Sequence, residues 1–147
     1  DVKLEVALSA FVSEDYVEDS EQRIALYTKI SSLTTQKEMQ SLLESISDGY
    51  GEAPNEVKNL CMLALMRNEA SEFNVERVKI TKLECYIVLK KTENIIDKTL
   101  AEVASSQGGK LVISNDIRIK FVPSQNVLKD VKMLTEMFEK AINLRKN

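Results

Sequence analysis

Histidine is absent from this 147-residue chain, which also has only two cysteines, two prolines and four glycines. The lack of histidine excludes Ser-His and Cys-His catalytic pairs and every histidine-ligated metal site. Two isolated cysteines supply no zinc cluster. Cys61 lies in an apolar run and Cys85 in a strand-like run, so we expect both to be small buried hydrophobic residues.

Long apolar runs are also missing. No stretch approaches the roughly 18 apolar residues that a membrane span needs, and the start shows no cationic and apolar leader, which favours a cytoplasmic location. The length and the 44% apolar and 29% charged residues are typical of one globular domain, residues 1–147. The chain begins without methionine and enters a strand-like pattern at once. Such a start fits a domain of a longer protein, and it fits a shortened chain equally well.

Charge is distributed unevenly along the chain. Residues 1–73 carry 6 Lys and Arg against 14 Asp and Glu, whereas residues 74–147 carry 14 against 9. The acidic front half would repel a phosphate backbone. The lysines of the rear half alternate with acids, which favours a solvated surface and leaves nucleic-acid contact as the alternative.

The apolar pattern predicts an α+β fold in which a mixed sheet carries packed helices. An N-terminal strand at 3–9 is followed by three helices and then by two strand-strand-helix units. The three helices are expected after Asp19, after Thr35, and from Pro54 to about Phe73. The predicted strands of the second half are 75–81, 85–89, 111–114 and 117–122, with helices opening at Thr92, whose apolar face includes Ile95, and at Ser124.

Capping residues mark the helix ends. Asp19 with Gln22, and Thr35 with Glu38, have the spacing of capping boxes. Glycines at 49 and 51 are expected to end the second helix, because glycine adopts the left-handed conformation easily. Asn74 is the expected left-handed terminator of the third helix.

Carboxylates are the remaining candidates for enzymatic chemistry. The acids of the first loop have the pattern of solvated helix caps, and Gly108-Gly109 follows a helix without forming a phosphate-binding loop. The sequence therefore predicts no catalytic, cofactor-binding or metal-binding residue. The acids of that loop are Glu14, Asp15, Glu18, Asp19 and Glu21.

One group of acids lowers local stability. Glu44 and Asp48 are four residues apart on the second helix, so they share a face and repel each other. Both fall in its last turns, where the helix dipole disfavours an exposed anion by ~0.3–1 kcal/mol. Glu52 and Glu56 extend the acidity. Such a loss of local stability is typical of a functional surface, and the alternative is a solvated acidic face.

Three segments carry a resemblance to a known family. They are Ala10–Val17 (AFVSEDYV), Arg23–Lys29 (RIALYTK) and Asp48–Pro54 (DGYGEAP). In this order they resemble the C-terminal regulatory domain of the bacterial transcription-repair coupling factor. The first half of the chain matches in detail and the second half in its order of elements. The sequence departs from the family at Gly49, where the family has arginine, at Ser13, where it has proline, and at Asn74, where it has glycine.

The resemblance implies a non-catalytic domain of an ATP-driven DNA translocase that removes stalled RNA polymerase and recruits nucleotide excision repair. In that family the domain folds back on the N-terminal module and covers the surface that binds the damage-recognition ATPase. The ATP site lies in the parent's motor, so this chain is expected to bind no cofactor or membrane and to bind nucleic acid weakly or not at all. The alternative is a nucleic-acid-binding accessory module that uses the basic C-terminal half.

The family's docking region falls on Asp48, with Glu44 one turn earlier and Glu52 just beyond. We therefore expect Glu44, Asp48 and Glu52 to bind the partner as an electrostatic latch against arginines of the N-terminal module. Gly49 removes a donor that the family's arginine would supply. The expected roles of three further residues are structural: Tyr27 and Tyr50 pack between helices, and Arg23 caps or pairs with the acidic loop.

Overall fold

The computed structural model describes residues 1–91 and 96–146. The chain divides into two compact units. Unit 1 comprises residues 1–7 and the chain from residue 69 onwards, and unit 2 comprises residues 8–68. Because each unit has its own core, the two are described separately. The expectation of a single domain over residues 1–147 stays a prediction.

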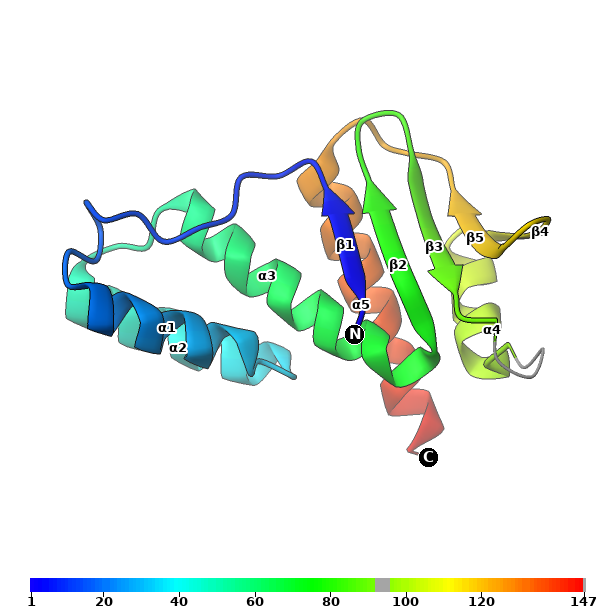
Figure 1. Cartoon of the computed structure of the whole chain (residues 1–147). Helices are drawn as coiled ribbons and strands as arrows, with labels where there is room; N and C mark the ends of the chain where they lie inside the picture. The colour runs from blue at the N-terminus through cyan, green and yellow to red at the C-terminus, as the bar shows by residue number, and fades with distance from the viewer. Residues whose placement is uncertain (92–95, 147) are drawn as a thin grey trace. The chain divides into compact units, whose positions relative to one another are not determined.

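Unit 2 is helical and contains α1 (Ser20–Ser31), α2 (Gln36–Tyr50) and all but the last two residues of α3 (Asn55–Ala70) (Figure 1). Each helix buries apolar residues at three- and four-residue spacings, which places them on one side of the helix. Cys61 is fully buried here, as the sequence predicts. The main buried side chains are Leu26 and Ile30 of α1, Met39 and Ile46 of α2, and Val57, Cys61 and Leu65 of α3.

The helix caps of unit 2 follow the sequence in part. The capping box at Thr35 is confirmed, with Thr35 accepting from the Glu38 amide at 3.1 Å and Glu38 accepting from the Thr35 amide at 3.2 Å. The box at Asp19 is wrong, because Asp19 accepts from the Glu21 amide and Gln22 accepts a hydrogen bond from Tyr50 instead.

Glycine ends α2 at one of the two predicted positions. Gly51 caps the helix with φ 87°, a left-handed conformation that glycine adopts without steric penalty. Gly49 lies inside the helix, so the expectation that it stops the helix is wrong.

Unit 1 contains a five-stranded sheet in the order β1-β2-β3-β5-β4. β1 runs parallel to β2 and the other neighbours are antiparallel, so the sheet is mixed and the predicted α+β class is confirmed. The strands are β1 (Lys3–Val6), β2 (Val75–Ile80), β3 (Cys85–Leu89), β4 (Lys110–Ile113) and β5 (Ile117–Phe121).

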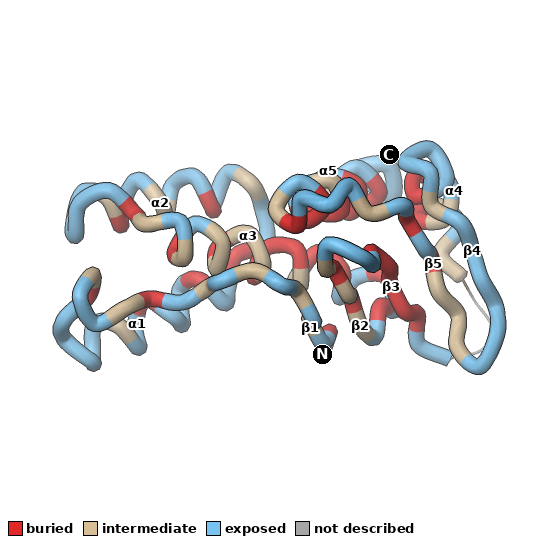
Figure 2. The backbone as a smooth tube through the Cα atoms, turned by 90° about the horizontal axis from the view of Figure 1, so that it is seen from above, coloured by how far each residue is buried: buried red, intermediate tan, exposed pale blue. Residues whose placement is uncertain are grey.

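Helices α4 (Lys98–Ser106) and α5 (Val127–Arg145) cover one face of this sheet, as both views show (Figures 1 and 2). The buried Val78 of β2 and Ile119 of β5 alternate with more exposed neighbours, as a half-covered sheet requires, whereas all five residues of the central strand β3 are buried. A short 3₁₀ turn, Ser71–Phe73, connects α3 to β2, and Asn74 follows with φ 60°. The predicted left-handed terminator is therefore confirmed.

Two helix starts in unit 1 differ from the sequence prediction. α4 begins at Lys98, capped by Asp97, which accepts from the Leu100 amide at 3.0 Å; Thr92 and Ile95, predicted to open this helix, lie outside the described residues. α5 is capped by Asn126 and not by Ser124, because the left-handed Gln125 (φ 72°) separates Ser124 from the helix.

Candidate functional site

The three predicted partner-binding acids lie at one end of unit 2. Glu44 and Asp48 are exposed on the last turns of α2, and Glu52 is exposed just beyond the capping Gly51. Glu52 lies 3.9 Å from Lys58, an exposed pair of small energetic value. Within the described residues, Glu44 and Asp48 form no ion pair. Their carboxylates therefore face solvent without a cation to neutralise them.

Two tyrosines attach the first acidic loop to this end of α2. The Tyr16 hydroxyl donates to the Gly51 carbonyl at 2.7 Å, and the ring centroids of Tyr16 and Tyr50 are 5.9 Å apart. The Tyr50 hydroxyl donates to Gln22 on α1 at 3.1 Å. Desolvation and the neighbouring Tyr50 raise the pKa of Tyr16, so its hydroxyl remains a donor at neutral pH.

The loop and the helix end together form an acidic depression of about 830 Å³. Arg23 is the basic residue of its lining, and its guanidinium is already occupied by the Val17 and Glu18 carbonyls at 2.8 and 3.3 Å. The predicted structural role of Arg23 is thus confirmed. The acids of the lining are Glu14, Asp15, Glu18 and Asp19.

We call these four acids together with Glu44, Asp48 and Glu52 the acidic end of unit 2. Of these seven acids, only Glu44, Asp48 and Glu52 are predicted as partner-binding from the sequence, whereas the loop acids have the pattern of helix caps. The missed signal was Tyr16, because a tyrosine inside an acidic loop brings a long side chain that reaches a distant backbone carbonyl. Asp19 does cap α1, yet it also lines the depression.

Tyr27 and Tyr50 are at the rim of the helices, and the expectation that they pack in the core is wrong. Each is 38% exposed. The Tyr27 hydroxyl accepts a hydrogen bond from the Val12 amide at 2.8 Å. The apolar positions between the helices are filled by aliphatic side chains, and the phenol oxygens stay where polar partners are available.

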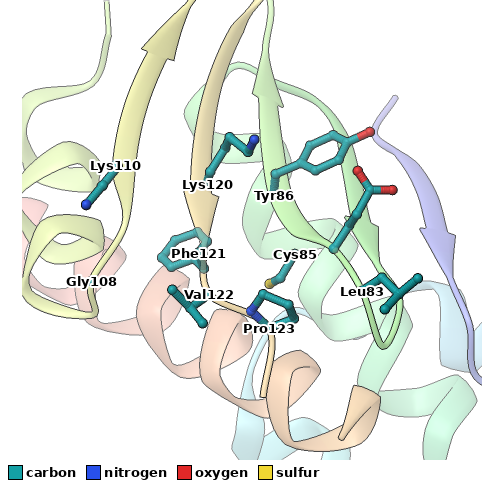
Figure 3. A pocket seen from close by; sticks show the side chains of 10 residues that line it. Leu83, Cys85, Tyr86, Gly108, Lys110, Lys120, Phe121, Val122 and Pro123 are labelled. Carbon is teal, nitrogen blue, oxygen red and sulfur yellow. The ribbon is translucent and has the colours of Figure 1, made fainter. Parts of the chain in front are cut away.

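Unit 1 has a cavity of about 440 Å³ at the end of the sheet where β3 begins and β5 ends (Figure 3). Cys85 lines it, and burial raises the pKa of its thiol to about 12. Burial also raises the pKa of Cys61, in unit 2, to about 11. Neither thiol is a nucleophile at neutral pH, because the reactive form is the thiolate. The other walls include Leu83, Phe121, Val122, Pro123, Lys110 and Lys120.

Residues 1–91 and 96–146 contain no group of three or more Cys, Asp or Glu side chains arranged to hold a metal ion. None of the helices described there combines the length and apolar character needed to cross a bilayer. We take the acidic end as the candidate site, because Glu44 and Asp48 are exposed there and form no ion pair within the described residues.

Comparison with known families identifies the fold and its relatives. The TRCF domain matches residues 6–100 of this chain. The chain belongs to the TRCF domain family. The match includes the whole acidic end and all three segments in which the sequence resembles the transcription-repair coupling factor, so the predicted family is confirmed.

Relatives of this TRCF domain are much longer proteins. The transcription-repair-coupling factor of Borreliella burgdorferi is 24% identical over 147 residues, which cover 99% of this chain and 13% of that protein. The Bacillus subtilis transcription-repair-coupling factor is 32% identical over 82 residues, covering 56% of this chain and 7% of that protein. The crystal structure of the C-terminal domain of transcription-repair coupling factor has the same fold, with a TM-score of 0.76, 19% identity, and coverage of 96% of this chain and 93% of that one.

Proposed function

We propose that this TRCF domain is a non-catalytic regulatory module of a transcription-repair coupling factor, and that it docks through its acidic end onto the N-terminal module of the same protein. The docked domain masks the surface that recruits the damage-recognition ATPase of excision repair, and its release exposes that surface. ATP use, DNA translocation and RNA polymerase binding belong to the remainder of the parent, and this domain needs no cofactor.

The observation that carries this proposal is the unpaired acidity of α2. Glu44 and Asp48 repel each other and the helix dipole, yet no cation of the described residues lies within ion-pair distance of either. The neighbouring depression adds four more carboxylates and a guanidinium that is already engaged. A cationic partner would relieve this repulsion. Ionic contacts of this kind steer association and remain reversible.

The proposed latch differs from the family pattern at Gly49, where the family has arginine. A Cβ at Gly49 would meet nothing within 4 Å, so close packing at this position does not require glycine in place of the family's arginine. Without that arginine, the cation that the described residues place near the turn is Lys58, which already lies 3.9 Å from Glu52. Docking should therefore rest on the carboxylates and should weaken steeply as salt is added.

The test is binding of the whole 147-residue chain to the N-terminal module of its parent, measured by calorimetry at 50 and 300 mM KCl. Asp48→Arg should weaken binding about tenfold or more, because it places a cation opposite the arginines expected on the partner. The matched control is Glu102→Arg on the exposed surface of α4, which makes the same change of charge in unit 1. The control should bind within about twofold of the unmodified chain.

Equal affinity of the Asp48→Arg variant and the unmodified chain would reject the acidic end as the docking surface. Equal weakening by both substitutions would show a dependence on net charge alone and would reject a localised latch. If the unmodified chain fails to bind at 50 mM KCl, autoinhibition through this module is wrong.

A further inference from the structure

The sheet of unit 1 has a second face, opposite the one that α4 and α5 cover (Figures 1 and 2). Side chains of a strand alternate between the two faces. Because Val78, Ile80, Ile119 and Phe121 are buried on the helix side, their neighbours in sequence lie on the opposite side. That side gathers six cations from four strands, and we call them the basic face: Lys3, Arg77, Lys79, Lys110, Arg118 and Lys120.

The sheet register arranges these cations in two rows. One row contains Lys3, Arg77 and Arg118, and the other contains Lys79, Lys120 and Lys110. Neighbouring strands are about 4.8 Å apart and the rows, two residues apart along each strand, are separated by about 7 Å. Cations of one row are thus about 5–10 Å apart. Two rows of positive charge at these spacings complement a polyanion with repeated phosphates.

Lys110 and Lys120 stand directly opposite each other on β4 and β5. Like charges in such a cross-strand pair destabilise the sheet. Both side chains are exposed and form no ion pair within the described residues, and both line the cavity beside β3 (Figure 3). Glu84 lines the same cavity but pairs with Lys79 at 3.2 Å, so this corner of the sheet holds two lysines without an ion pair, which an anionic ligand would neutralise.

Acids on the same face neutralise only part of its charge. Arg77 lies 3.9 Å from Glu5, Lys79 lies 3.2 Å from Glu84, and Arg118 binds Asp116 through two hydrogen bonds of 2.8 and 3.1 Å. Three acids thus face six cations. The hydrogen bonds from Arg118, with added attraction from Arg77 and Lys91, lower the pKa of Asp116. The lowered pKa is consistent with a positive electrostatic potential near this surface.

The basic face offers charge and no exposed ring. Tyr86 lies between the lysines of the second row, but it is only 5% exposed, with the Arg118 guanidinium 4.3 Å from its ring centroid. Figure 3 shows Tyr86 and Lys120 on neighbouring strands of this face. Proteins that hold single strands stack bases on exposed aromatic rings. A face with cations alone suits the phosphates of a duplex, whose bases are already stacked.

We propose that the basic face binds the sugar-phosphate backbone of duplex DNA without sequence preference. The surface lies in unit 1 and is separate from the acidic end, so this interaction does not depend on the proposed docking. It also departs from the sequence-based expectation of weak or absent nucleic-acid binding, because the linear order of residues interleaves these cations with acids, whereas the sheet collects them on one side.

The test is fluorescence anisotropy of a labelled 20-base-pair duplex of random sequence titrated with the whole chain at several KCl concentrations. Lys110→Glu combined with Lys120→Glu should lower the affinity at 50 mM KCl at least tenfold. It should also reduce the slope of log K against log[KCl] by about 1.8, since each phosphate contact contributes about 0.9. The matched control is Lys132→Glu combined with Lys140→Glu, two exposed lysines of α5 on the other side of the sheet.

The control pair should retain affinity within about threefold, and circular dichroism should show that both variants are folded. Should the glutamate pair unfold, Lys110→Gln with Lys120→Gln removes the same charges more mildly and should lower affinity about fivefold. Equal losses in test and control pairs, or no binding at 50 mM KCl, would overturn the proposal. The proposal would also be wrong if the chain bound a single-stranded oligonucleotide more tightly than the duplex. It would likewise be wrong if poly-glutamate competed more strongly than unlabelled duplex, because that result would indicate an acidic protein partner.

Discussion

At the scale of single residues, Glu69 is the side chain least suited to its surroundings. It is the penultimate residue of α3, belongs to unit 1 and is 2% exposed, and its Oε1 atom has no hydrogen-bond partner within the described residues. Burial, together with the negative charges of the nearby Glu139 and Glu72, raises the pKa of this carboxyl to about 8. At neutral pH Glu69 is thus mainly protonated, which avoids the large free-energy penalty of an unpaired buried charge.

This raised pKa links the stability of the chain to pH. Between the ordinary pKa near 4.5 and about 8 the unfolded chain has lost the Glu69 proton while the folded chain keeps it, so stability falls as pH rises. Glu69→Gln should remove this dependence. We expect the variant to gain on the order of 4 kcal/mol over the unmodified chain at pH 8.5 and little at pH 4.5. Urea denaturation at the two pH values measures the difference.

Glu76→Gln, which makes the same change at an exposed carboxyl of β2, is the matched control and should shift stability only slightly at either pH. A Glu69→Gln variant whose stability changes with pH as steeply as that of the unmodified chain would contradict the assignment of the raised pKa.

At the scale of elements, glycine has opposite roles at two positions. A Cβ at Gly109, between α4 and β4, would lie 2.8 Å from the Ala104 carbonyl oxygen and 2.8 Å from the Phe121 ring. Gly49 lies inside α2 and has open space around it. The first glycine is required by close packing, and the second only weakens a helix.

The same substitution should therefore change stability in opposite directions. Gly109→Ala is expected to lower the free energy of unfolding by roughly 1–3 kcal/mol, since backbone and ring must move apart. Gly49→Ala is expected to raise it by about 0.5–1 kcal/mol through helix propensity. Each variant is the control for the other in one urea-denaturation series. Equal effects of the two substitutions would refute the role of packing at Gly109.

At the scale of the whole molecule, the two units differ in charge. Unit 2 carries 5 Lys and Arg against 10 Asp and Glu, and unit 1 carries 15 against 13. Four acids of unit 2 line the depression beside Tyr50, while six of the cations of unit 1 gather on one side of its sheet. The two proposed interaction surfaces therefore lie on different units and have opposite charge.

This separation predicts that the two interactions can be lost one at a time. Because the two surfaces are formed by different residues, Asp48→Arg should weaken docking and leave duplex affinity within about twofold. Lys110→Glu with Lys120→Glu should have the reverse effect. The affinity of each variant for the duplex is measured by fluorescence anisotropy. Its affinity for the N-terminal module is measured by calorimetry. Joint loss of both interactions in either variant would contradict two independent surfaces.

Local features were predictable from the order of residues. The capping box of Thr35 and Glu38, the left-handed Asn74 and the glycine stop at 51 depend on neighbours within four residues, and all three are found. The order of strands and helices and the burial of both cysteines follow from hydrophobic periodicity, which is also local. The acids on α2 could be placed on one face for the same reason.

Features that depend on contacts between distant segments were decided by the tertiary structure. Gln22 was expected to cap its own helix but binds Tyr50 across 28 residues, and Tyr16 joins the acidic loop to Gly51 across 35. Strand pairing brings Lys3, Arg77 and Arg118 into one row, and packing buries Glu69. The physical reason is that helix, turn and capping preferences depend on a few neighbouring residues. The charge of a surface and the burial of a carboxyl depend instead on which distant segments lie side by side in the folded chain.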